Sequence, residues 1–510
     1  MRPLRFRSAV VSTSALALAA GVLAGTGTAR ADGPLAPRTG FTMVVAQADG
    51  SVVVPTDGEA IPNIDSVKST IRAYYNATGG IANKKSSRYI DEVAALERHI
   101  LSVLDGSDGD DAVVFDADDT LLWNYDFEDN ALNFNFDPAI QNTWVTGHKF
   151  PAVPGMPELV HELIDRGYEI YGITGRRGDQ EADTIANLTE RGYTDDLTPG
   201  GTPIFTAANM YTKDPVTNGP PASIPTQPWV DCAADGTSTS CSTVEFKALT
   251  REHIESTDGV DIVMNVGDQW SDLQGGAADH VTKLPNPTYF LPSPNIAGAP
   301  ASDAEMVPPT SYVMEPDGSS GRSVRSGDDI PNIDPVRKMI RGYYNASSGG
   351  IANKTTSPYI SQLATLQSSW TPQVTSNCTR QSQARNAALV QQQAASAAVD
   401  AARAAVHKAA RKVAKAKKKL KKATTAKERK VAKRKLKKAR KVLRNTRAKL
   451  AAARAALRAI TVPAAPALVF DADDPTLWTY DMEDGEMKFV FDPVRQGAWV
   501  SGHLFPAVPG

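Results

Sequence analysis

The hydrophobic pattern between residues 61 and 294 alternates between helix-like and strand-like stretches. Apolar residues recur at helical spacing in the stretches that we predict to be helices, which are 64–75, 89–104, 156–166, 178–191 and 243–256. Short continuous apolar runs are typical of buried strands, and they occur at 112–115, 168–173, 260–266 and 289–291. Strands that alternate with helices favour an α/β fold built on a doubly wound parallel sheet.

Polar residues directly follow three of the predicted strands. The first strand leads into Asp116 to Thr120, the second into Thr174, and the third into Asp268 to Asp272. Lys247 lies on the helix that precedes the third strand. Each of these residues alone is typical of a helix cap or a turn. Because the carboxyl ends of parallel strands open into one crevice, we expect these side chains to meet there.

Such a gathering of carboxylates indicates a cation. Several carboxylates at one edge of a sheet repel one another unless a positive charge holds them together. Oxygen ligands suit Mg²⁺, which keeps several waters and is shared with phosphate groups. The pattern therefore favours a magnesium site that also receives a phosphate.

The order of the motifs resembles that of the haloacid dehalogenase (HAD) superfamily of phosphohydrolases. The runs Lys247 to Arg251 and Asn265 to Asp272 are similar to its acid phosphatase branch, which includes plant vegetative storage proteins and bacterial secreted acid phosphatases. The resemblance extends from about Ile61 to Pro294. The residues that match the four family motifs are Asp116, Asp118, Thr120, Thr174, Lys247, Asp268 and Asp272.

The resemblance implies hydrolysis of small phosphomonoesters through an aspartyl-phosphate intermediate. Asp116 would attack phosphorus, and Asp118 would protonate the leaving alcohol and then deprotonate the attacking water. Thr174 and Lys247 would bind the phosphoryl oxygens.

The implied cofactor is Mg²⁺. Asp116, Asp268 and the backbone carbonyl of Asp118 would bind it, with Asp272 in support. The ion would screen the negative charges of the nucleophile and the phosphate, which must approach each other.

Three further basic residues leave alternatives open. Lys213 competes with Lys247 for the phosphate, but it lies in a loop rich in proline and glycine (211–221), where no helix would fix it. Arg176 and Arg177 would either meet anionic groups of the substrate or form a solvated pair.

The front part of this unit occurs twice in the chain. The residues from Ile61 to Lys84 recur from Ile330 to Lys354, starting 269 positions later, and Val114 to Asp119 recurs as Val469 to Asp474. The second copy contains an insertion and matches the first only as far as Gly155. We expect it to form a truncated second copy of the α/β unit that lacks most of a sheet and is therefore either poorly folded or packed against the first copy.

The second copy is not expected to catalyse by itself. Asp471 and Asp473 keep the positions of the nucleophile and the acid–base residue. Pro475, however, replaces the motif threonine and offers neither a hydroxyl nor a backbone N–H. No counterparts of the later motifs follow.

Residues 401–460 form a strongly basic segment, with 25 Lys and Arg residues and one acidic residue, Glu428. Valine and leucine recur every seven residues on both sides of a break near 423–426, which favours a helical hairpin or coiled coil. Alanine and lysine favour helices, whereas repulsion between like charges opposes them. The segment would either bind anionic polymers without sequence specificity or serve as a solvated spacer. It lacks Phe, Tyr and Trp, so base-specific readout is not expected.

The first 31 residues predict export. Arg2, Arg5 and Arg7 precede an apolar stretch rich in small residues, and Ala29 to Ala31 matches a cleavage site before Asp32. A membrane anchor is the alternative, but the stretch is short and rich in alanine and glycine rather than leucine. After cleavage no transmembrane segment is expected, so we predict a secreted protein.

The three cysteines agree with an oxidising compartment. Cys232 and Cys241 lie nine positions apart in a polar stretch, and we expect them to form a disulfide that staples a surface loop. Cys378 is left over, either free or paired between chains. No cysteine–histidine cluster has the spacing of zinc ligands.

The sequence predicts seven successive segments. They are a signal peptide (1–31), a linker (32–60), the phosphatase-like domain (61–294), a second linker (295–329), the start of the second copy (330–372), the basic helical insertion (373–461) and the continuation of the second copy (462–510). The favoured function is a secreted acid phosphatase. The alternatives are a catalytically idle storage or binding protein, and a surface adaptor whose basic coiled coil binds polyanions.

Overall fold

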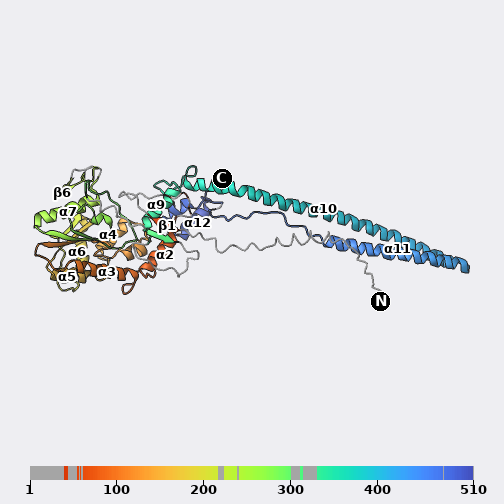
Figure 1. The fold of residues 1–510 in the computed structure, drawn as a ribbon, viewed down its shortest axis with the longest axis horizontal. Coiled ribbons are helices and arrows are strands. Elements are labelled where there is room, and N and C mark those ends of the chain that lie inside the picture. Colours follow the sequence, from red (N-terminus) through yellow and green to blue (C-terminus); the bar gives the residue numbers. More distant parts are fainter. Residues whose placement is uncertain are drawn as a thin grey trace, which may run out of the picture. The chain divides into compact units, whose positions relative to one another are not determined.

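A computed structural model describes residues 40–43, 54, 56, 58, 61–215, 223–237, 240–299, 310–313, 330–474 and 476–508. The chain divides into two compact units (Figure 1). The first unit comprises Met1–Ile360 and Thr479–Phe505, and the second comprises Ser361–Trp478 and Pro506–Gly510. The predicted signal peptide, most of both predicted linkers and Pro475 lie outside the described residues.

The first unit is built on a five-stranded parallel sheet. Its strands are β2 (Asp111–Phe115), β3 (Glu169–Arg177), β4 (Met210–Lys213), β7 (Asp261–Gly267) and β8 (His280–Lys283). Their order across the sheet is β4-β3-β2-β7-β8, and each neighbouring pair is parallel. The central strand β2 is almost entirely buried. The prediction of an α/β fold with a parallel sheet is therefore confirmed.

The order of the strands reverses at β2. The chain moves outward from β2 to β3 and β4, then crosses to the other side of β2 to form β7 and β8. Where the direction of winding changes, the carboxyl ends of the strands border a crevice. In this sheet the change lies between β2 and β7, which pair from Asp111 with Asp261 to Phe115 with Val266.

Five of the observed helices lie close to their predicted positions. They are α2 (Ile64–Tyr74), α3 (Arg88–Val103), α5 (Met156–Asp165), α6 (Glu181–Glu190) and α7 (Thr243–Asp258). The side chains of Asn63 and Ser87 accept hydrogen bonds from backbone N–H groups in the first turns of α2 and α3, which explains where these two helices begin. Helices α5 and α7 pack against β3, and α6 packs against β4.

Several elements of the first unit differ from the sequence-based expectation. Strand β4 occupies the start of the stretch that was expected to be a loop, and helix α4 (Pro138–Thr146) was not expected. The strand expected at 289–291 is wrong, because these residues form no strand and the edge strand β8 lies earlier. His280 and Val281 of β8 are exposed, so this strand lacks the continuous apolar run that marks a buried one.

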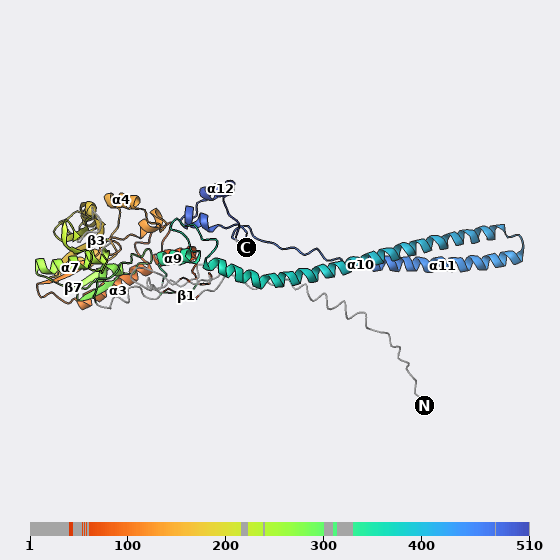
Figure 2. The same ribbon diagram turned by 90° about the horizontal axis from the view of Figure 1, so that it is seen from above.

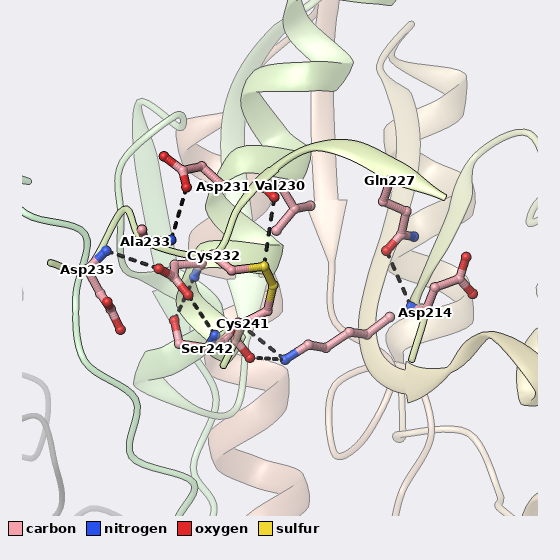
Figure 3. The surroundings of a disulfide bond; sticks show 11 residues. Asp214, Gln227, Val230, Asp231, Cys232, Ala233, Asp235, Cys241 and Ser242 are labelled. Carbon is pink, nitrogen blue, oxygen red and sulfur yellow. Dashed lines mark hydrogen bonds between the residues drawn. A yellow bond between two sulfur atoms is a disulfide. The ribbon is translucent and has the colours of Figure 1, made fainter. Parts of the chain in front are cut away.

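A hydrophobic cluster joins the sheet to α7 and contains the expected disulfide (Figure 3). Cys232 follows strand β6 (Gln227–Asp231), and Cys241 lies just before α7. The disulfide between them is buried against apolar residues of β2, β3, β7 and α7. It therefore fixes the approach of the chain to α7. Cys378 is a free cysteine.

Two small antiparallel sheets lie outside the five-stranded sheet. Strand β6 pairs with β5 (Ser223–Ile224), and β1 (Gly40–Met43) pairs with β9 (Thr310–Val313), both antiparallel. A 3₁₀ turn (Gly178–Gln180) leads from β3 into α6. Among the residues that the structure describes, no helix combines the length and apolar character that a membrane crossing requires.

The second copy does not form a second α/β sheet. Its described part contains α9 (Ile333–Tyr343), the π-helix η7 (Asp481–Glu486) and α12 (Pro493–Ser501), and no strand occurs within 330–474 or 476–508. Val469 and Phe470, the counterparts of the buried end of β2, are 96% and 67% exposed. The expectation of a second α/β unit is therefore wrong. A strand needs neighbours for its backbone hydrogen bonds, and none pairs with this stretch.

The helical front of both copies is nevertheless held by equivalent contacts. Arg72 of α2 forms an ion pair with Asp129 of the π-helix η3 (Phe127–Ala131) at 2.6 Å. Arg341 of α9 forms the matching pair with Asp484 of η7 at 2.8 Å. In addition, α9 packs against α2 within the first unit. The front of the second copy therefore folds as part of the phosphatase-like unit.

The second unit is dominated by two long helices. They are α10 (Pro358–Lys422) and α11 (Ala426–Arg458), which lie side by side as a hairpin (Figure 2). Helix α10 ends at Lys422, and α11 begins four residues later. Thr425 and Glu428 form the capping box that starts α11. The predicted helical hairpin is confirmed, although α10 begins well before the basic residues. The buried residues of the two helices are Val399, Ala409 and Val413 in α10 and Ala432 and Leu436 in α11.

Candidate active site

Two acidic residues meet where the strand order reverses. Asp116 directly follows β2, and its backbone N–H donates to the carbonyl of Val266 in β7 at 3.0 Å. Asp268 directly follows β7. The parallel pairing of β2 with β7 therefore brings both carboxylates to the same edge of the sheet.

A third carboxylate joins them from the short helix α8 (Trp270–Leu273). One oxygen from each of Asp116, Asp268 and Asp272 lies within 4.8 Å of the others, and all three residues are buried. Gly267 makes this approach possible, since a Cβ at that position would lie 2.5 Å from the Cβ of Asp272. Asp116 of the first motif and Asp268 and Asp272 of the fourth are thus brought together.

Lys247 is the cation that balances part of this charge. Its Nζ lies 2.5 Å from Asp116 Oδ1 and 2.7 Å from Asp272 Oδ1. Burial lowers the pKa of Lys247, but the two carboxylates outweigh burial and hold it above its ordinary value, so the side chain is charged. A capping box between Ser242 and Glu245 fixes the start of α7, one turn before the lysine.

The acidic residues nevertheless carry more charge than Lys247 offsets. Burial raises the pKa of the Asp116 carboxyl well above its ordinary value, with Lys247 opposing the shift and Asp272 and Asp268 adding to it. Burial, together with the charges of Asp272 and Asp119, likewise raises the pKa of Asp268. The arrangement is therefore short of positive charge.

These residues fit a hard divalent cation. Asp268 Oδ1 is buried and has no hydrogen-bond partner among the described residues, which leaves one oxygen available for an ion. Asp116 contributes a second oxygen in reach of the first. Since Asp272 is already engaged by Lys247, it suits a supporting role. Carboxylate oxygens are the ligands that Mg²⁺ prefers in proteins.

Asp118 is held by a different partner, Arg176 near the end of β3. Arg176 donates from Nε and Nη2 to the two carboxylate oxygens at 3.0 and 2.7 Å, and Asn124 adds a bond of 2.9 Å. Burial alone would raise the pKa of Asp118, but the charge and hydrogen bonds of Arg176 lower it below its ordinary value. The Arg176 side chain is only 1% exposed, so the alternative of a solvated pair is wrong for it. Arg177, by contrast, is exposed and pairs with Asp179.

Two threonines of the motifs are fully buried. Thr174 lies in β3, and its Oγ1 accepts the backbone N–H of Arg176 at 3.2 Å. The Oγ1 of Thr120 has no hydrogen-bond partner among the described residues. Both hydroxyls are thus held inside the fold at the ends of neighbouring strands.

Sequence reasoning missed a loop after β8 that contacts the acidic group. Asn286 donates from Nδ2 to Asp119 Oδ2 at 3.2 Å and to Asp268 Oδ2 at 2.6 Å. Burial raises the pKa of Asp119 to about 7. The sequence did contain a signal, because polar residues follow β8 as they follow the other strands. The fourth strand was expected later, at 289–291, so the residues after β8 were not recognised as a strand end.

Lys213, the competing lysine, serves another contact. Its Nζ donates to the backbone carbonyls of Cys241 and Ser242 at 2.6 and 3.3 Å. It ties β4 to the disulfide loop before α7. Lys247, rather than Lys213, therefore contacts Asp116.

A family model described as "HAD superfamily, subfamily IIIB (Acid phosphatase)" matches residues 50–201 and 204–292. These ranges hold the parallel sheet and the acidic group. This part of the chain therefore belongs to the subfamily IIIB acid phosphatases of the HAD superfamily, which confirms the resemblance drawn from the motifs.

Individual relatives are named as a stem glycoprotein, as acid phosphatases or as a vegetative storage protein. The chain is 29% identical over 185 residues to "Stem 28 kDa glycoprotein" of Glycine max and 27% identical over 189 residues to "Acid phosphatase 1" of Solanum lycopersicum. Each alignment covers 36% of this chain, and the chain spans only 60% and 61% of those two proteins. "Vegetative storage protein 1" of Arabidopsis thaliana is 25% identical over 254 residues, covering 46% of this chain and 75% of its own length. Among solved structures, the class C acid phosphatase from Bacillus anthracis is similar to this chain with 16% identity and a TM-score of 0.31. The match covers 52% of this chain and 94% of the phosphatase chain.

Proposed function

We propose that the first unit is a Mg²⁺-dependent acid phosphatase that hydrolyses small phosphomonoesters through an aspartyl-phosphate intermediate. The observation that carries this proposal is the buried carboxylate of Asp116, which contacts Lys247 and lies beside Asp268 and Asp272. A nucleophilic oxygen, a fixed cation and further metal ligands at one sheet edge suit attack on an anionic phosphoryl group. Membership of an acid phosphatase family supports the same conclusion.

Two carboxylates divide the proton and phosphoryl chemistry. An oxygen of Asp116 forms a bond to phosphorus while the ester P–O bond breaks, and Asp118 supplies the proton that the leaving alkoxide needs. In the second step Asp118 removes a proton from water, which attacks phosphorus and releases Asp116. Arg176 holds the pKa of Asp118 below its ordinary value, so the proton-donating form of Asp118 is scarce near neutral pH and increases as the pH falls.

The remaining residues bind charge. Lys247 and Thr174 would hold the phosphoryl oxygens, and the lysine also offsets the negative charge of the nucleophile. Asp116, the carbonyl of Asp118 and Asp268, with Asp272 in support, would hold Mg²⁺. When bound, this ion supplies positive charge that stabilises the phosphoryl group during transfer.

Replacement of the nucleophile tests the proposal. We expect Asp116→Asn to lower kcat for p-nitrophenyl phosphate by about a thousandfold or more, since the covalent step is lost, and EDTA to abolish wild-type turnover until Mg²⁺ is restored. Asp471→Asn is the matched control, because it changes the equivalent aspartate of the second copy and should leave the rate unchanged. Equal rates for wild type and Asp116→Asn would contradict the proposal that the first unit is a phosphatase with Asp116 as its nucleophile.

The alternative of a catalytically idle storage or binding protein agrees with the names of two relatives, "Vegetative storage protein 1" and "Vegetative storage protein 2" of Arabidopsis thaliana. An idle member of the fold would be expected to lose its nucleophile, but Asp116 is present and contacts Lys247. Wild-type protein that binds inorganic phosphate and Mg²⁺ without turning over any phosphomonoester would favour this alternative.

A second function is proposed for the hairpin, the binding of anionic polymers. The observation that favours it is a groove between α10 and α11 that is lined largely by lysine side chains. They are Lys412, Lys415, Lys419, Lys422, Lys427 and Lys435. Through this groove the second unit would act as a surface adaptor for the phosphatase.

The salt dependence of binding tests this second function. We expect affinity for random-sequence double-stranded DNA, used as a probe polyanion, to fall linearly with salt concentration on a logarithmic plot. A variant with Lys415, Lys419 and Lys422 changed to Gln should reduce the slope by about two to three, because each phosphate contact contributes about 0.9. Affinity that stays constant as salt increases would contradict the proposal.

A further inference from the structure

The second copy reaches the candidate active site through the residue before α9. Asn332 donates from Nδ2 to the backbone carbonyl of Asn286 at 3.1 Å and to that of Tyr289 at 2.5 Å. Asn286 is the residue that contacts Asp268 and Asp119. One side chain of the second copy therefore binds both ends of the segment that lies against the acidic group.

The next two residues strengthen this attachment. The backbone N–H of Ile333 donates to the carbonyl of Pro287 at 3.2 Å. The carboxylate of Asp334 accepts the N–H of Phe290 at 3.1 Å. Three consecutive residues of the second copy are thus hydrogen-bonded to the loop 286–290, which we call the site loop.

The inner side of the site loop controls which oxygen Asp268 presents. Asn286 Nδ2 and Gln269 Nε2 both donate to Oδ2 of Asp268, at 2.6 and 2.7 Å. The other oxygen, Oδ1, is buried with no hydrogen-bond partner among the described residues. Asn286 is itself held in place by Thr288, whose N–H and hydroxyl donate to its Oδ1 at 2.8 and 2.6 Å. The position of the loop therefore determines the orientation of a carboxylate that faces the other acids.

We propose that Asn332 and Asp334 are positioning residues of the phosphatase site. They hold the site loop from outside, so that Asn286 keeps Oδ1 of Asp268 directed at the place of the metal. This inference rests on the proposed function of the first unit. It gives the second copy, which has no sheet and no complete set of motifs, a part in the reaction of the first.

The framework of α9 explains why Asn332 can serve this role. Its Oδ1 accepts the N–H of Asp334 as a helix cap, which fixes the amide plane and turns Nδ2 towards the loop. Ile333 is fully buried, and α9 packs against α2. Asn63 is the counterpart in the first copy, and it caps α2 in the same way by accepting the N–H groups of Asp65 and Ser66.

A pair of matched substitutions tests the inference on the full chain. Asn332→Asp keeps a good helix cap but replaces the donor by a carboxylate that faces two carbonyls. Asn63→Asp makes the same chemical change at α2. Two quantities are measured: amide hydrogen exchange of residues 284–291 without metal, and the Mg²⁺ concentration that gives half-maximal turnover. We expect Asn332→Asp to speed exchange in the site loop and to raise the Mg²⁺ requirement by about tenfold, as the loss of a ligand's outer partner does.

The control and the second variant separate the outcomes. Asn63→Asp should leave both quantities as in wild type, and Asp334→Ala should move both in the same direction as Asn332→Asp. The inference is overturned if Asn332→Asp matches wild type in its Mg²⁺ requirement, whatever the exchange rates. If wild type neither hydrolyses phosphomonoesters nor binds Mg²⁺, the proposed function fails. In that case unchanged exchange in Asn332→Asp overturns the inference independently, and faster exchange supports the attachment of the loop by the second copy.

Discussion

Glu97 is a half-buried carboxylate outside the candidate site whose surroundings disfavour its charge. It lies on α3, and burial together with the charge of Glu158 raises its pKa to about 7. Its Oε1 has no hydrogen-bond partner among the described residues. Gly155 lies so close to the carboxylate that a Cβ there would overlap it. At the scale of the residue, ionising Glu97 therefore costs stability.

Stability should respond to pH at this residue with a defined sign. Because the folded pKa is raised above the unfolded value of 4.5, the contribution is fully favourable below that value and is lost as the pH rises through about 7. We expect Glu97→Gln to raise the free energy of unfolding at pH 8 by about 1–2 kcal/mol, a figure reduced for partial exposure of the side chain. At pH 5 the gain should be much smaller. Urea unfolding at both pH values measures it, and an equal gain at both would contradict the assignment.

The sequence predicted the acidic residues of the site better than their partners. Asp116, Asp268 and Lys247 could be recognised because strand ends and motif spacing are local properties of the chain. The contact of Arg176 with Asp118, and that of Asn286 with Asp268, depend on which strands become neighbours. Pairing of that kind is decided by the whole sheet and leaves no pattern in either segment alone.

At the scale of the element, α7 places Lys247 in the site, and two interactions fix the N-terminus of this helix. The capping box between Ser242 and Glu245 satisfies N–H groups of the first turn. The disulfide between Cys232 and Cys241 ends one residue before the cap. The position of the lysine therefore depends on a loop closed by a covalent bond.

Removal of this bond should destabilise the first unit. Closing a loop of this length is worth about 2–3 kcal/mol on chain-entropy arguments. We expect the double variant Cys232→Ala/Cys241→Ala to lower the free energy of unfolding in urea by about that amount. Dithiothreitol should lower the stability of wild type similarly and leave the variant unaffected. A reductant effect of the same size on both proteins would show that another bond is responsible.

Elements with local signals were predicted well, and elements without them were not. Helices α2, α3 and α7 were found because each combines apolar periodicity with a capping residue. The edge strands β4 and β8 have four residues each and buried positions that are interrupted by partly exposed ones. The β2 sequence is repeated at Val469 and Phe470, but it forms no strand there, because a strand forms only where its neighbours also exist.

At the scale of the whole molecule, charge is distributed very unevenly. The net charge of −2 combines 55 basic with 57 acidic residues, yet 25 of the basic ones lie in residues 401–460. The second unit is therefore strongly cationic, and the rest of the chain is strongly anionic. Composition averaged over the chain conceals this difference, which is seen only when residues 401–460 are counted separately.

We also propose that the whole chain is exported. The motif at Ala29 to Ala31 predicts cleavage before Asp32, and the disulfide between Cys232 and Cys241 suits an oxidising compartment. Expression of the full chain in a secreting host should give protein in the medium that begins at Asp32 and contains one oxidised cysteine pair. N-terminal sequencing and intact mass before and after thiol labelling measure this. Full-length protein that remains inside the cells would contradict export.

The hairpin is inserted in the sequence of the first unit, which continues after it. The chain leaves the first unit after Ile360 and returns to it at Thr479, where η7 supplies Asp484 to Arg341 and the carbonyl of Phe489 accepts Lys68 Nζ at 2.7 Å. A protease that recognises lysine or arginine would meet many targets in α10 and α11. Cleavage there would leave a nicked molecule whose two pieces stay associated through these contacts. The intact and nicked forms would then co-elute on a sizing column and separate only under denaturing electrophoresis.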